Sequence, residues 1–188
     1  MPTFPRLLAP LLLAGMALAG CDDKSPAPAA ATTVDTVLNS SAAAVNTSAA
    51  TTTPVAYSAV FDPSANKDVS SNLGKIHIVN VSGASVGCAQ LLGTGNTTIT
   101  GTWSLHLDPE PAGTTYAMGT VSGASLDAAV RTGNGLPVDR SAVSTADRDA
   151  LQQAIGHGTK GRVTFTGTVS GPCQAYITLQ VNTKLTLN

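Results

Sequence analysis

The 188-residue sequence has little charge, few aromatic side chains and no excess of basic residues. Charged residues make up 11% of the chain, aromatic residues make up 4%, and the formal net charge is −1. A protein that binds DNA or RNA usually presents a strongly basic face to the phosphates. We therefore expect no nucleic acid partner.

Long apolar runs are also missing, except at the N-terminus. The first 21 residues, MPTFPRLLAPLLLAGMALAGC, contain Arg6, an apolar run over residues 7–18 and then small residues before Cys21. This order is typical of an export signal, and the run is shorter than the ~20 apolar residues that a membrane-spanning helix needs. The sequence therefore predicts an exported chain.

Residues 18–21, LAGC, resemble the lipobox of bacterial lipoproteins. The resemblance implies that residues 1–20 are a signal peptide that is removed, that Cys21 carries a diacylglycerol, and that its new amino group is acylated, as with palmitate. Several acyl chains would hold the protein to a membrane far better than one. The alternative is an ordinary cysteine behind a leader that is not cleaved there.

The same resemblance implies a location in the cell envelope, anchored by lipid and facing the periplasm. Asp22 and Asp23 follow the anchor. An aspartate in this place resembles the inner-membrane retention signal of some enterobacterial lipoproteins. The inner membrane is therefore slightly favoured over the outer one.

Cysteine is scarce, and two cysteines remain once Cys21 is assigned to the lipid. In an oxidising compartment, Cys88 and Cys173 are expected to form a disulfide. The long loop that it closes would contribute up to ~4 kcal/mol to stability. The alternatives are two buried free thiols, or a disulfide to another protein.

Residues 21–53 contain few charges and no aromatic residue, and Ala, Ser and Thr dominate them. This composition predicts a flexible, lipid-anchored linker. A short helix through Val34, Val37 and Leu38 is the alternative. The folded domain is then expected to cover residues 54–188.

From residue 54 onward, apolar and polar residues alternate with a period of two, which indicates strands that are buried on one face. The pattern is strongest in residues 97–107, 161–171 and 173–188, and it places Trp103 and Cys173 on inward faces. Further strands are expected in residues 55–61, 75–81, 85–92 and 114–121. The expected fold is all-β, an antiparallel β-sandwich or barrel.

One short helix is expected near residues 145–155. Ser144 is a good N-cap, with Asp147 three residues later, and Gly156 is the expected end. Ala150, Leu151, Ala154 and Ile155 would form its apolar stripe.

The motifs for catalysis, metal and cofactor binding are weak. The glycines of GHGTKG, residues 156–161, follow a helix instead of opening one, so they do not predict a nucleotide site and no cofactor is expected. Oxygen ligands alternate at Asp62, Ser64, Asn66 and Asp68, as in half of a calcium loop, but the central glycine and the closing acid are missing. We therefore expect no metal site, and these four are the only calcium candidates.

No catalytic residue is assigned, although Asp108, Glu110, Asp139 and the histidines could still meet in space. The preferred interpretation is a non-catalytic envelope lipoprotein whose β domain binds a partner protein, as an accessory subunit, inhibitor or immunity factor does. The alternatives are a hydrolase of envelope polymers or a carrier of small ligands.

Overall fold

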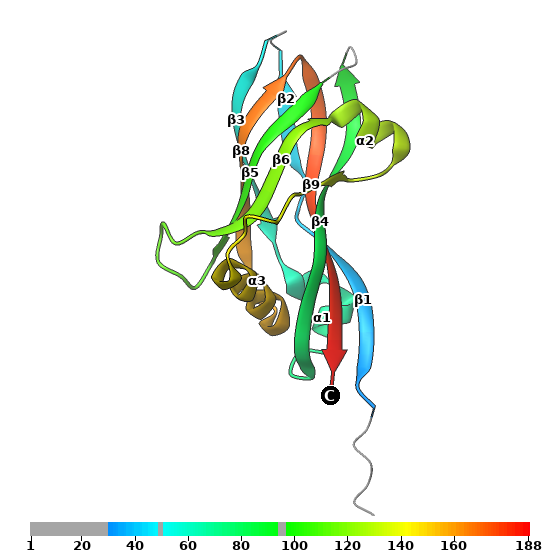
Figure 1. Cartoon of the computed structure of the whole chain (residues 1–188), viewed down its shortest axis with the longest axis vertical. Helices are drawn as coiled ribbons and strands as arrows, with labels where there is room; N and C mark the ends of the chain where they lie inside the picture. Colours follow the sequence, from blue (N-terminus) through cyan, green and yellow to red (C-terminus); the bar gives the residue numbers. More distant parts are fainter. Residues whose placement is uncertain (1–29, 49–50, 94–96) are drawn as a thin grey trace, which may run out of the picture.

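The computed structural model describes residues 30–48, 51–93 and 97–188, and the side chains of 90–93 are not described. Two antiparallel sheets pack face to face, so the fold is the all-β sandwich that the alternation predicted (Figure 1). The first sheet contains β1 (Thr32–Asn39), β2 (Ala43–Thr47), β9 (Cys173–Leu187), β4 (Ile76–Gly93) and β7 (Leu136–Pro137). The second contains β3 (Thr53–Phe61), β8 (Gly161–Ser170), β5 (Thr98–Leu107) and β6 (Tyr116–Ser125).

The core lies between the sheets and is built around Trp103 of β5 and Phe165 of β8. These residues are opposite each other in the strand register, and their ring centroids are 5.2 Å apart with the planes tilted by 53°. Both side chains are almost fully buried, and Cys173 points inward with them. The inward placement predicted for Trp103 and Cys173 is confirmed.

Short helical segments cover the ends of the sandwich. They are η1 (Pro63–Ala65), α1 (Lys67–Ser70), α2 (Leu126–Thr132) and α3 (Thr145–His157). The predicted helix is α3, capped by Ser144, whose Oγ accepts from the Asp147 backbone N–H at 3.1 Å. It ends at Gly158 in the left-handed region, two residues later than predicted.

The prediction of a flexible linker over residues 21–53 is wrong for residues 32–47. These residues form β1 and β2, which pair in succession with β9. Ser40 joins the two strands, because its backbone N–H donates to the Leu179 carbonyl and its Oγ accepts from the Leu179 N–H, both at 2.9 Å. The inward positions are held partly by Thr36, Ala43 and Thr47, so apolar alternation was too weak to indicate a strand. Residues 21–29 lie outside the described part.

The prediction of a disulfide between Cys88 and Cys173 is also wrong, because both are free thiols. They lie on neighbouring strands, but Cys88 is opposite Ile177 and Cys173 is opposite Gly93. Cys88 is therefore displaced by four residues along β9 from a position opposite Cys173, or ~13 Å at the usual strand rise. A disulfide requires Cα atoms less than ~7 Å apart.

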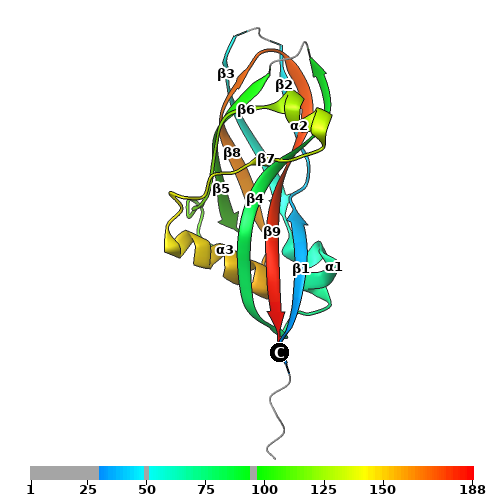
Figure 2. The ribbon, with the colours of Figure 1, turned by 45° about the vertical axis from the view of Figure 1, so that its right-hand side comes forward.

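The first sheet extends beyond the second at the end where the C-terminus lies, and α1 and α3 lie beside this extension (Figures 1 and 2). Leu151, Ala154 and Ile155 of α3 are buried there. A Cβ at Gly156 would lie 3.4 Å from Val79 Cγ2 of β4, so the last turns of α3 lie close to this strand.

None of the helices in the described part is both long and apolar enough to span a bilayer. Cys21 and the lipobox lie outside the described residues.

Candidate functional site

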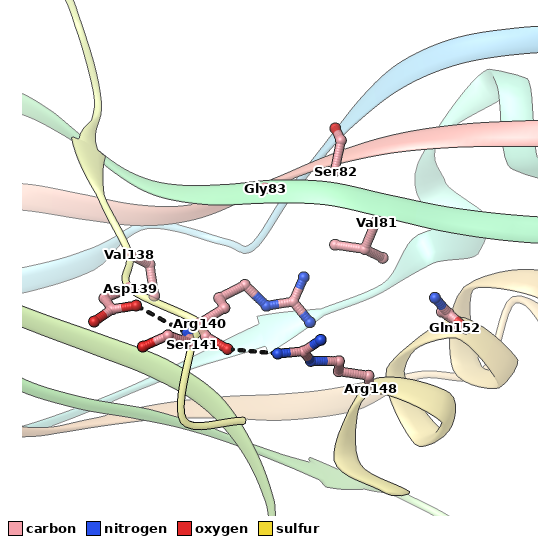
Figure 3. A pocket seen from close by; sticks show the side chains of 9 residues that line it. All are labelled: Val81, Ser82, Gly83, Val138, Asp139, Arg140, Ser141, Arg148 and Gln152. Atoms are coloured by element: carbon pink, nitrogen blue, oxygen red, sulfur yellow. Dashed lines mark hydrogen bonds between the residues drawn. The ribbon is translucent and has the colours of Figure 1, made fainter. Parts of the chain in front are cut away.

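A cleft lies between α3 and the adjacent part of β4, and we call it the β4–α3 cleft. It consists of two hollows of about 370 and 300 Å³ that share Gln152 as a lining residue. Figure 3 shows the larger hollow, in which Arg140 and Arg148 point toward each other from the loop before α3 and from α3 itself. The lining of the larger hollow is completed by Val81, Ser82, Gly83, Val138, Asp139, Ser141 and Gln152.

The backbone around Asp139 fixes the position of Arg140. Asp139 forms a β-bridge with Thr120 of β6, with N···O distances of 2.8 and 2.7 Å. The loop lies so close to β6 that a Cβ at Gly119 would be 2.5 Å from the Asp139 carbonyl oxygen. Gly119 also has a φ of 131°, a backbone conformation that residues with a side chain rarely adopt. The loop before α3 is thereby held against the second sheet.

The helix places Arg148 and Gln152 on one face, because residues four positions apart are neighbours on a helix. Arg148 Nη2 donates to the Arg140 carbonyl oxygen at 3.0 Å. This contact brings the two guanidinium groups into the same hollow (Figure 3).

The two arginines are not neutralised by the acids near them. Within the described part of the chain, neither forms an ion pair, and the buried Nε of Arg140 has no hydrogen-bond partner. The neighbouring Asp139 is exposed, and its carboxylate accepts from the Ser141 backbone N–H at 2.8 Å. The hollow therefore holds two positive charges that form no ion pair, although the carboxylate of Asp139 also lines it.

The electrostatics of Arg140 agree with this geometry. Burial lowers the pKa of Arg140, and the charge of Arg148 lowers it further. An arginine stays protonated at neutral pH even so, since its ordinary pKa lies far above it. A carboxylate or phosphate entering the hollow would relieve the repulsion and could take hydrogen bonds from both planar groups.

The smaller hollow brings together two histidines that are far apart in the sequence. His77 of β4 and His157 of α3 both line it, together with Asp149. No three His, Cys, Asp or Glu side chains gather as they would around a metal ion anywhere in the described part. The smaller hollow is therefore a polar extension of the cleft.

Two of the four calcium candidates, Asp62 and Asn66, cap helical segments. Asp62 caps η1 by accepting from the Ser64 backbone N–H at 3.0 Å, and it pairs with Lys160 Nζ at 2.9 Å. Asn66 caps α1 by accepting from the backbone N–H groups of Asp68 and Val69. The oxygens of Asp62 and Asn66 thereby stabilise the turn after β3.

The acids and the histidine near the end of β5 belong to one turn. Tyr116 donates its hydroxyl to Glu110 Oε1 at 2.6 Å, and His106 Nδ1 lies 2.6 Å from the Thr114 carbonyl oxygen. Asp108 precedes Glu110 in the same turn, whereas Asp139 lies on the cleft. No described contact links Glu110 or His106 to the cleft.

Sequence reasoning missed the arginine pair. Arg140 and Arg148 are eight positions apart and lie on different elements, so no spacing rule associates them. The available signal was that both flank the predicted start of α3 in a chain with few charges. No family model matches the sequence, and none of the curated proteins is significantly similar to it.

Proposed function

We propose that this chain is a membrane-anchored, non-catalytic envelope lipoprotein whose β-sandwich binds a partner protein through the β4–α3 cleft. The observation that carries the proposal is the unneutralised pair of Arg140 and Arg148. A partner that inserts an acidic group could form the ion pairs that Arg140 and Arg148 do not make within the described part of the chain.

Arginine suits this role. Hydrogen bonds to a charged group contribute roughly 1.5–3 kcal/mol each, and arginine is over-represented among the residues that dominate binding energy at interfaces. Arg148 is exposed and Arg140 is half-buried, so the pair is accessible from solvent at one end and held by the protein at the other.

The anchor is tested separately, through Cys21. We expect metabolic labelling with palmitate to mark the full chain in its native host and to leave a Cys21→Ser variant unlabelled. Intact mass should show that residues 1–20 are gone. A wild-type chain that keeps its leader, or that has an unmodified thiol at Cys21, contradicts the anchor but not the cleft.

Binding is tested by a photocrosslinking amino acid at Gln152, which lines both hollows. In the native host, this position should crosslink to one protein in constant proportion. Replacing both Arg140 and Arg148 by Gln should abolish the crosslink, because the partner's acidic group then has no charge to bind.

Two controls make the result specific. The same crosslinker at Thr102, an exposed residue of β5, should not capture this protein. An Arg162→Gln variant removes an exposed arginine of β8 outside the cleft and should leave the Gln152 crosslink intact. A crosslink that survives loss of both cleft arginines would refute the proposed site.

A further inference from the structure

The part of β4 that borders the cleft has an unpaired edge. From Ile76 to Gly83 this strand pairs with β9 on one side. On its other side β7 reaches only Ser85 and Val86, and Val138 adds one bond to the Ala84 carbonyl oxygen at 2.9 Å. Among the described residues, no strand pairs with the outer side of residues 76–83.

The cleft follows this edge along its length. The smaller hollow is lined by residues 76–79 and the larger one by residues 81–83, and α3 forms the opposite wall of both. Eight residues of strand measure roughly 25 Å, which is the length of a short extended peptide. The length of this edge thus matches that of one additional strand.

The sequence of this edge lacks the usual protection against pairing. Exposed edges are commonly blocked by lysine, proline or inward-pointing charges. Residues 76–83, IHIVNVSG, contain none of these, and Ile78 is 52% exposed, although register shifts at Ile76/Ile78 and Val81/Gly83 interrupt the pairing with β9. No side chain of this type blocks an added strand.

Charge distinguishes the two ends of the groove. Arg140 and Arg148 lie at the end near Gly83, whereas His77, His157 and Asp149 lie at the other. A strand held along β4 would therefore place a negative group beside the arginines. Peptide recognition by strand addition combines main-chain hydrogen bonds with specific side-chain or terminal contacts in this way.

We infer that the partner enters as an extended segment that adds a strand to the edge of β4 at residues 76–83 and places a carboxylate between Arg140 and Arg148. The carboxylate belongs to the segment's C-terminus or to an Asp or Glu side chain within it. This inference rests on the proposed function and specifies how the partner binds.

The probe is a displayed library of random peptides of about ten residues with free C-termini, selected against the purified full chain. The selected peptide is synthesised with a free and with an amidated C-terminus, and hydrogen–deuterium exchange is measured by mass spectrometry. We expect the peptide to slow exchange of those amides in residues 76–83 that point away from β9, because the added strand gives them hydrogen-bond partners.

Affinity should depend on the arginines. Loss of one charged hydrogen bond corresponds to about a tenfold to hundredfold weaker Kd, so Arg140→Gln and Arg148→Gln should each weaken binding by this factor. Arg162→Gln should bind like the wild type. Loss of binding on amidation assigns the carboxylate to the C-terminus, and retention of binding by a peptide with Asp or Glu assigns it to a side chain.

The outcomes separate this inference from the proposed function. Binding that needs the arginines but leaves exchange of residues 76–83 unchanged overturns strand addition and leaves the cleft as an acid-binding site. Binding by peptides without any carboxylate, binding that ignores both arginines, or a selection that yields no binder overturns the inference. Absence of a Gln152 crosslink in the wild-type chain, or its persistence without both cleft arginines, overturns the proposed function itself.

Discussion

The thiol of Cys88 is half-buried on the wall of a hollow that also contains Ala129 of α2. Burial raises the pKa of Cys88 to about 11, with smaller contributions from Cys173 and Asp127. Because the thiolate is the reactive form, this thiol should be nearly inert at neutral pH. We therefore expect Cys88 to contribute packing contacts and no reactivity.

We predict that iodoacetamide at pH 8 modifies Cys88 roughly a hundredfold more slowly in the native protein than in the unfolded chain, since a rise of two pKa units lowers the thiolate fraction by that factor. In denaturant without reductant, Cys88 and Cys173 should both be modified. Peptide mapping by mass spectrometry measures both results. A disulfide-linked pair of peptides that contain Cys88 and Cys173 would contradict the conclusion that both thiols are free.

At the scale of elements, strands were predictable where large apolar residues alternate. β5, β8 and β9 have such patterns, and their inward positions are buried as predicted. β4 was expected as two strands but is one, because three register shifts interrupt its alternation. β1 and β2 were missed because threonine and alanine fill several inward positions there, and only the pairing with β9 explains their burial.

The ion pair between Asp62 and Lys160 connects η1 with the loop after α3. Burial alone would raise the pKa of Asp62, but hydrogen bonds from Ser64 and Lys160 outweigh it and lower the pKa below its ordinary value. The carboxylate therefore contributes stability at a pH above that ordinary value of about 4, and the contribution is lost as the pH falls through the lower pKa of the folded state.

We predict that Asp62→Asn reduces the free energy of unfolding at pH 7 and that this difference from the wild type disappears in acid. Asparagine keeps the cap but cannot pair with Lys160. Asp62→Ala loses the cap as well, which costs about 1 kcal/mol more. Urea unfolding measured from pH 7 down to pH 3 checks both variants. An effect of Asp62→Asn that is independent of pH would mean that the ion pair is not its cause.

At the scale of the whole molecule, the core between the two sheets contains the contact of Trp103 with Phe165, which are paired on the neighbouring strands β5 and β8 of the second sheet. The Phe165 ring also covers a glycine pair, Gly101 and Gly167, where a Cβ at Gly101 would lie 2.5 Å from Phe165 Cζ. The ring thus fills the space that these two glycines leave open.

We predict that Phe165→Ala lowers the free energy of unfolding by about 3–5 kcal/mol, because it removes a buried ring and leaves a cavity over the glycines. Thr166→Ala, on the exposed face of the same strand, should stay within about 0.5 kcal/mol of the wild type. Denaturant unfolding followed by circular dichroism and by the emission of Trp103, the single tryptophan, measures both. Equal losses in the two variants would contradict this account of the core.

The sandwich class and helix α3 could be predicted from local sequence patterns, whereas the candidate site could not. Alternation and capping act between residues close in sequence, so Ser144 and the strand of Trp103 could be identified. The cleft depends on the bridge between Thr120 and Asp139 and on the packing of α3 beside β4, which are long-range contacts. Arg140 and Arg148 acquire their shared environment only from those contacts.

The pairing of β9 with three other strands, β1, β2 and β4, has a consequence for the order of events during synthesis. Because β9 follows every other described strand along the chain, the earlier three are synthesised before their common neighbour exists. Until it arrives, they remain exposed to wrong pairings and to aggregation, and folding that depends on such distant contacts is slow. The first sheet therefore cannot form until β9 is present, whichever compartment the chain folds in.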